Sequence, residues 1–186
     1  MRILMLGNSF TAANNLPQQL ASLTGAEVVA HTRGGARLAE QMNPKTKMGA
    51  RTLAALVNER WDYVILQEMS NGPVTAREKF LQSARGLCEK IRAASAIPVF
   101  YATWAYENGS KKMAVMNMSY EEMYQAMYEA YHHAAEENQA LIADVGKAFY
   151  EKADEIKLYA EDSCHPNEMG TKLAAEVIAE VILQDT

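Results

Sequence analysis

The sequence predicts an α/β fold, a three-layer αβα sandwich built on a doubly wound parallel sheet of five strands. Short apolar runs rich in Val, Ile, Tyr or Phe alternate with longer amphipathic stretches along the whole chain. Such runs are typical of strands buried in a parallel sheet. Strand followed by helix, repeated along the chain, indicates helices on both faces of that sheet. Because crossovers between parallel strands are right-handed, the expected topology is flavodoxin-like.

Each expected element follows from its hydrophobic pattern. The strands are the apolar runs Arg2–Leu6, Glu27–His31, Tyr63–Gln67, Val99–Thr103 and Leu141–Asp144. The helices are the amphipathic segments Pro17–Leu23, Met48–Glu59, Ala76–Ala94, Tyr120–Asn138 and Glu168–Leu183. The connection Tyr106–Ser119 is too long for a tight loop, and we expect it to form a flap over one end of the sheet. With 186 residues and no internal repeat, the chain is expected to form one domain, residues 1–186.

Composition narrows the class of protein. Hydrophobic residues make up 49% and charged residues 22% of the chain, which is ordinary for a globular protein. The net charge is −5 and Lys and Arg form no block, so neither nucleic acid nor a membrane is expected as a partner. No apolar stretch reaches transmembrane length, and the apolar run after Met1-Arg2 is too short for a signal peptide. The expected location is therefore cytoplasmic.

The two cysteines, Cys88 and Cys164, show neither C-x-x-C nor Cys/His metal spacing. We expect two free thiols rather than a disulfide, and no metal. Cys164 lies next to His165 and could be read as a thiol nucleophile. Adjacent side chains point in different directions, however, and no activating group is evident in the sequence. A serine nucleophile is therefore the stronger hypothesis.

The chemically suggestive segments all follow expected strands. Ser9 follows the first strand, Gly34-Gly35 the second, Ser70-Asn71 the third and Trp104 the fourth. Ligands of doubly wound sheets bind outside the carboxyl ends of the strands. The sequence therefore places these segments around one site, where Asn8, Gly34 and Trp104 are expected to line the substrate pocket.

A serine hydroxyl needs a base within hydrogen-bond reach before it can act as a nucleophile at neutral pH. His165 is the histidine with a suitably spaced acid, Asp162, just before the terminal helix. Pro166 disfavours the α conformation at His165 and suits the start of that helix. Gly170, inside the helix, would permit close approach to the loop after the first strand. Ser9, His165 and Asp162 are therefore the candidate catalytic residues of an esterase-type hydrolase.

At these motifs the chain resembles the SGNH (GDSL-like) hydrolases. The segment Gly7–Thr11 is similar to the first block of that family, with Asn8 where aspartate is commoner. The last block is matched by Asp162, His165, Pro166, Asn167 and Gly170. The resemblance implies that Ser9 is the nucleophile and an oxyanion donor through its N–H, that His165 is the base, and that Asp162 orients the histidine. It also implies that no metal or organic cofactor is used.

The resemblance further implies two more oxyanion donors. Gly35 matches the family's glycine after the second strand, whose N–H is a donor. Asn71 matches the asparagine after the third strand, whose side-chain amide completes the hole. The chain departs from the family at Met69, where glycine is expected, and at Gly72, where aspartate is usual. Because of that departure, Gln67 remains an alternative source of the amide.

The expected function is hydrolysis of a small acyl ester, with acetylated carbohydrate as the first substrate class to test. The expected partner is thus a small molecule. Two alternatives stay open at this stage. The chain could be a non-catalytic ligand-binding protein that keeps the same fold and cleft, or it could transfer the acyl group to an alcohol instead of water.

Overall fold

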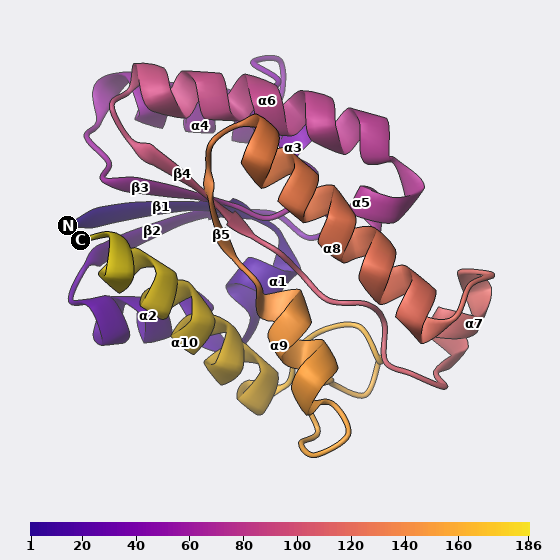
Figure 1. Ribbon diagram of the computed structural model, residues 1–186. Coiled ribbons are helices and arrows are strands. Elements are labelled where there is room, and N and C mark those ends of the chain that lie inside the picture. The colour runs from indigo at the N-terminus through magenta and orange to yellow at the C-terminus, as the bar shows by residue number, and fades with distance from the viewer.

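The protein is built on a five-stranded parallel sheet with the strand order β2-β1-β3-β4-β5. The computed structural model describes residues 1–186, and Figure 1 shows the sheet between two layers of helices. The strands are β1 (Arg2–Gly7), β2 (Glu27–Thr32), β3 (Tyr63–Leu66), β4 (Ile97–Tyr101) and β5 (Leu141–Ala143). Every neighbouring pair is parallel. The predicted α/β fold class and the doubly wound topology are confirmed.

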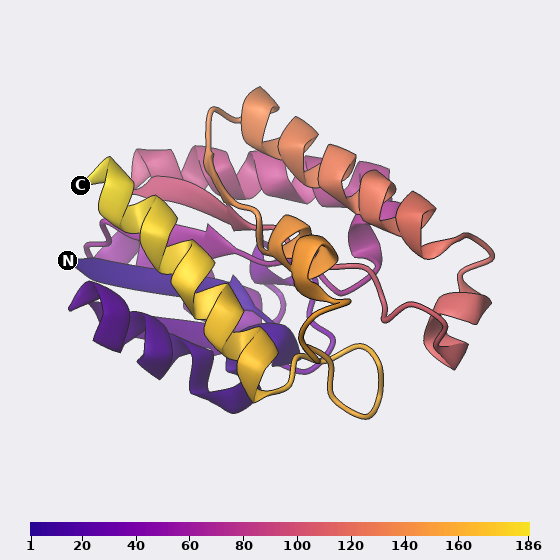
Figure 2. The same cartoon turned by 60° about the horizontal axis from the view of Figure 1, so that its bottom comes forward.

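Helices cover both faces of the sheet. In Figure 1, α4, α6 and α8 lie above it and α2, α9 and α10 lie below it. The six span α2 (Leu16–Thr24), α4 (Lys47–Asn58), α6 (Arg77–Ala93), α8 (Tyr120–Glu137), α9 (Val145–Lys152) and α10 (Glu168–Asp185). In Figure 2, α10 runs alongside α2, so the last helix packs next to the first long one. The layer formed by α2 and α10 brings the two ends of the chain to the same side of the sheet.

The predicted strands and long helices agree with the observed ones to within two residues. Four helical segments of four or five residues were not predicted: α1 (Ser9–Ala12), α3 (Leu38–Gln41), α5 (Gly72–Thr75) and α7 (Lys111–Val115). A single turn is too short to show a hydrophobic period. The eight-residue helix α9 was not predicted either. The segment Tyr106–Ser119 contains α7, which begins where the Ser110 hydroxyl accepts the N–H of Met113.

The sheet lies in a continuous hydrophobic core. Ile3, Leu4, Leu6, Val64 and Leu66 are fully buried on the interior strands β1 and β3, with helices packed on both faces. This packing makes the sheet a rigid base, and the loops at its carboxyl edge are held by the strand ends. No helix of the protein combines the length and the apolar character needed to cross a membrane.

Gly170 occupies a crowded position at the start of α10. A Cβ atom there would lie 2.3 Å from the carbonyl oxygen of Leu158 and 2.9 Å from the Phe149 ring. The role expected for Gly170 is therefore wrong, because its own neighbours are α9 and the segment before Asp162 rather than the loop after the first strand. The absent side chain instead lets α10 start directly against that segment, only a few residues after His165.

We expect Gly170→Ala to destabilise the fold by about 1–3 kcal/mol, since the new methyl group meets a backbone carbonyl that cannot move alone. Urea unfolding followed by circular dichroism measures the change. Gly86→Ala in α6 is the matched control, because the Cβ there meets the flexible side-chain end of Met42. Alanine is the better helix former, so that control should be neutral or stabilising. Equal losses in the two variants would contradict the interpretation.

Candidate active site

Ser9 lies at the carboxyl end of β1, as the first residue of α1. Asn8 caps this short helix, its Oδ1 accepting the Phe10 N–H at 3.0 Å. Gly7 makes the sharp exit from the strand possible, since a Cβ there would lie 2.2 Å from Thr11 Oγ1. The turn therefore presents the half-buried Ser9 hydroxyl at the edge of the sheet.

The structure brings Ser9, His165 and Asp162 together. Ser9 Oγ lies 2.8 Å from His165 Nε2, and His165 Nδ1 lies 2.5 Å from Asp162 Oδ2. These contacts link a serine to an imidazole and the imidazole to a carboxylate, in the order needed for proton transfer from the hydroxyl. The chain can therefore present an activated alcohol at this edge of the sheet.

Asp162 also shapes the loop that carries the histidine. Its Oδ1 accepts the backbone N–H groups of Cys164 at 3.1 Å and of His165 at 2.9 Å. Partial burial raises the pKa of Asp162, but hydrogen bonds from the His165 ring and from these two N–H groups outweigh burial and bring it to about 2. The carboxylate is therefore ionised at neutral pH, the form that accepts the imidazole proton and orients the ring.

Two side chains from other loops hold the loop that carries His165 in place. Asn14 Nδ2 donates to the Pro166 carbonyl at 3.1 Å and to Thr171 Oγ1 at 2.8 Å. Trp104 Nε1 donates to the Cys164 carbonyl at 3.0 Å. Asn14 lies five residues after Ser9, so its bonds connect the segment that carries Ser9 directly to the segment that carries His165.

Trp104 does not line an open pocket. Its side chain is 1% exposed and lies between two rings, with centroids 4.8 Å from Phe10 and 3.9 Å from Phe149. Phe10 in turn meets the His165 ring edge-on at 5.2 Å. The expectation that Trp104 lines the substrate pocket is wrong. Neighbouring aromatic rings cover both faces of the indole, so Trp104 packs behind the site and supports it.

Asn8 is likewise not a pocket residue. It is 2% exposed, and its Nδ2 donates to the Ala36 carbonyl at 3.1 Å. Gly34 and Gly35 form an exposed turn just before that carbonyl, and Gly35 adopts a φ of 68° that favours glycine. The backbone N–H groups of Ser9 and Gly35 make no hydrogen bond within the protein, so both are free to donate to a ligand.

Gln67 is not available as an oxyanion donor. Its Oε1 accepts the Asn8 N–H at 3.0 Å and the Thr11 hydroxyl at 2.9 Å. Its Nε2 donates to the Glu68 carbonyl at 2.5 Å. The side chain is 1% exposed, so the alternative role for Gln67 is corrected: its amide is used to hold the turn before Ser9.

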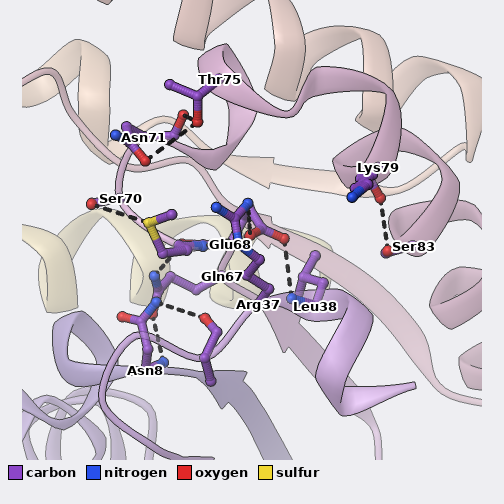
Figure 3. Close-up of polar contacts among 12 residues, drawn as sticks. Asn8, Arg37, Leu38, Gln67, Glu68, Ser70, Asn71, Thr75, Lys79 and Ser83 are labelled. Carbon is purple, nitrogen blue, oxygen red and sulfur yellow. Dashed lines mark hydrogen bonds and ion pairs between the residues drawn. The ribbon is translucent and has the colours of Figure 1, made fainter. Parts of the chain in front are cut away.

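Asn71 is partly exposed at the start of α5, and its amide Nδ2 lies 3.8 Å from the Met116 sulfur. Figure 3 shows Asn71 beside Thr75, with Ser70 and Gln67 between it and Asn8. The Asn71 amide thus makes no hydrogen bond to Ser9, His165 or Asp162. Unlike Gln67, however, Asn71 makes no strong hydrogen bond that would prevent its side chain from turning when a ligand binds.

Two other roles are conceivable for this region, a thiol nucleophile at Cys164 and a metal site. Both cysteines are free and buried, and burial raises the pKa of Cys164, which disfavours the thiolate. Asp162, Cys164 and His165 could supply three metal ligands within 4.8 Å of one another. Both ring nitrogens of His165 are already bonded within the Ser–His–Asp group, so a metal there would have to displace it.

Sequence reasoning missed Glu68, a buried carboxylate at the end of β3. Its side chain is 2% exposed and accepts the backbone N–H groups of Leu38 and Met69 at 3.1 and 2.9 Å. The signal in the sequence was a charged residue placed directly after an apolar strand, where solvent is scarce.

A cavity of about 820 Å³ between the ends of α4 and α6 contains none of these residues and is unrelated to the chemistry described.

Comparison with known proteins agrees with this geometry. The sequence model of the GDSL-like lipase/acylhydrolase family matches residues 5–173. A structure from Slackia heliotrinireducens, described as a candidate SGNH hydrolase, is 51% identical, covers 98% of each chain and superposes with a TM-score of 0.94. None of the curated proteins compared with the chain matches it significantly.

More distant structures share the fold. An acetylxylan esterase from Geobacillus stearothermophilus is 16% identical over 97% of this chain and 93% of its own, with a TM-score of 0.73. A DUF4886 family protein from Bacteroides uniformis is 19% identical over 99% of this chain and 83% of its own, also with a TM-score of 0.73. The family match and the 51% identical structure support a hydrolase.

The lowered pKa of Asp162 predicts how acid affects stability. Its carboxylate stabilises the folded state fully above about pH 4, and this contribution is lost as the pH falls through about 2. Asp162→Asn should therefore be less stable than wild type at pH 7, and the two stabilities should converge between about pH 4 and pH 2. Urea unfolding across this range measures the difference.

The control for this series is Asp154→Asn, since Asp154 is exposed and makes no hydrogen bond through its side chain. Its stability should follow that of wild type at every pH. A constant difference between Asp162→Asn and wild type down to pH 2 would show that the bonds from His165 and Cys164 do not stabilise the ionised form.

Proposed function

The chain belongs to the GDSL-like lipase/acylhydrolase family, and on that premise we propose that it is a serine esterase that hydrolyses a small acyl ester. The observation that carries the proposal is the hydrogen bond of 2.8 Å from Ser9 to His165, extended by the bond of 2.5 Å from His165 to Asp162. An alcohol, a base and an orienting acid in this order are the parts of a catalytic triad.

In the proposed first step Ser9 Oγ attacks the ester carbonyl while His165 Nε2 takes the hydroxyl proton. The ionised Asp162 stabilises the imidazolium that forms and holds the ring in place. The free N–H groups of Ser9 and Gly35 donate to the developing oxyanion, and the Asn71 amide turns from Met116 to join them. His165 then gives its proton to the alcohol as it departs, and Ser9 remains acylated.

In the second step water attacks the acyl-serine with His165 again as the base. The carboxylic acid departs and the Ser9 hydroxyl is restored, so atoms and protons balance without any metal or organic cofactor. Each oxyanion donor is worth about 100-fold or more in rate, so the donors at Ser9 and Gly35 account for much of the proposed catalysis.

The exposure of the site supports a substrate in which a small acyl group is esterified to a bulky alcohol. The side chains of His165 and Asp162 are 37% and 42% exposed, so the group lies at an open surface. A sugar could remain in solvent beside it while only the acyl carbonyl reaches Ser9. The acetylxylan esterase among the structural neighbours acts on an acetylated sugar polymer, and we propose acetylated carbohydrate as the substrate class here.

Ser9→Ala should abolish hydrolysis of p-nitrophenyl acetate, lowering kcat at least about 1,000-fold, because the acyl group has no acceptor. Release of p-nitrophenolate measures the rate. Ser22→Ala, at an exposed position in α2, is the matched control and should keep wild-type activity. If wild type and Ser9→Ala are equally inactive on acetyl esters of phenols and of sugars, the chain is a binding protein rather than an esterase.

We also expect preference for short acyl chains. Hydrolysis of p-nitrophenyl acetate should exceed that of the octanoate by about tenfold or more in kcat/KM, because added methylene groups at the open surface beside His165 and Asp162 stay in solvent and gain little binding energy. Steady-state kinetics over esters of two to eight carbons measures this. A kcat/KM that rises with chain length would instead point to a lipid-type substrate.

A further inference from the structure

Glu68 is a charged side chain buried in the wall of the proposed active site. It lies two residues after the end of β3, is 2% exposed, and sits between the loop after β2 and the turn after β3 (Figure 3). An ionised carboxylate in such a place is costly unless hydrogen bonds compensate it. The proposed mechanism uses no group at this position, so its presence calls for a separate explanation.

The carboxylate joins the two loops that carry oxyanion donors. Oε2 accepts the N–H of Leu38, which follows the Gly34-Gly35 turn, at 3.1 Å. Oε1 accepts the N–H of Met69, which precedes Asn71, at 2.9 Å. Each oxygen therefore holds one loop. Because a carboxylate has two acceptor oxygens, the one side chain accepts from both loops at once.

The structure makes room for this carboxylate and partly balances its charge. A Cβ at Gly72 would lie 2.8 Å from Glu68 Oε1, so glycine at that position leaves space for the side chain. Arg37 Nη1 lies 3.9 Å from the same oxygen. Burial raises the pKa of Glu68 overall, and the two N–H groups and Arg37, which favour the ionised form, offset only part of this effect.

A second side chain, that of Asn8, also holds the Gly34-Gly35 turn. Asn8 Nδ2 donates to the carbonyl of Ala36, the residue after Gly35, at 3.1 Å. Glu68 binds the backbone at Leu38, two residues further on. The Gly35 backbone is therefore fixed relative to Ser9 through Asn8 and relative to the β3 turn through Glu68.

We propose that Glu68, together with Asn8, is a positioning residue that fixes the oxyanion donors of Ser9 and Gly35 relative to each other. This inference rests on the proposed esterase function. Donors aimed at the developing charge stabilise a transition state only when they are held in place, and a displacement of about 1 Å can cost about 100-fold in rate. Glu68 would thus affect the rate without contacting the substrate.

Glu68→Gln tests the proposal with the smallest change of shape. The amide presents one N–H₂ group where a carboxylate oxygen accepted a backbone N–H, so one of the two loops is released. We expect kcat on p-nitrophenyl acetate to fall about 10- to 100-fold with KM within about threefold of wild type. The Ki of a trifluoromethyl ketone, which forms an oxyanion on the serine, should rise by the same factor as kcat falls.

Glu78→Gln is the matched control, because Glu78 is an exposed carboxylate on α6 without a hydrogen-bond partner. It should match wild type in kcat and in inhibitor binding. A merely structural role for Glu68 would lower the melting temperature and leave kcat of the folded protein and the Ki of the ketone unchanged, and that result would overturn the proposal. So would a rise in KM alone.

If Glu68→Gln does not fold, Asn8→Ser decides the matter. Serine can still cap α1 but is too short to reach the Ala36 carbonyl. Asn58→Ser, exposed at the end of α4, is its control. Loss of kcat matched by weaker ketone binding supports the proposal, and wild-type values for both overturn it. The result is separable from the proposed function, because an active wild type with inactive Ser9→Ala establishes the esterase whatever Glu68 does.

Discussion

The hydrogen bond between Ser9 and His165 is the interaction on which the site depends, and it joins the two ends of the chain. The two residues are separated by 156 positions in the sequence, and only 2.8 Å separates Ser9 Oγ from His165 Nε2. The parallel sheet makes this possible because all its strands end at the same edge. The packing of α10 beside α2 then carries the last loop back to the exit of β1 (Figure 2).

The polar side chains around that bond form two groups, which differ in their exposure to solvent. Ser9, His165 and Asp162 are partly exposed, whereas Asn8, Gln67 and Glu68 are buried. The buried group bonds almost entirely to backbone N–H and carbonyl groups of the three loops. Such bonds satisfy backbone atoms that no regular secondary structure can satisfy at a strand end. The same bonds fix where the free N–H groups point.

The sequence was sufficient to predict the sheet, its long helices and the meeting of Ser9 with His165 and Asp162, because hydrophobic period and strand-end position determine these features. It was insufficient for Trp104, Asn8 and Gln67, which we placed in the pocket or the oxyanion hole. A residue at a strand end can face the substrate or the neighbouring loops, and position along the chain does not distinguish the two. Burial and bonding partners decide, and both depend on the folded neighbours.

The placement of the two halves of the site at β1 and just before α10 also bears on biosynthesis. During translation Ser9 leaves the ribosome early, whereas His165 and Asp162 follow only when most of the sheet has been made. A partly synthesised chain therefore carries the Ser9 hydroxyl without the imidazole that hydrogen-bonds to it in the folded protein. The hydrogen bond between Ser9 and His165 can therefore form only late, once the loop before α10 has reached the exit of β1.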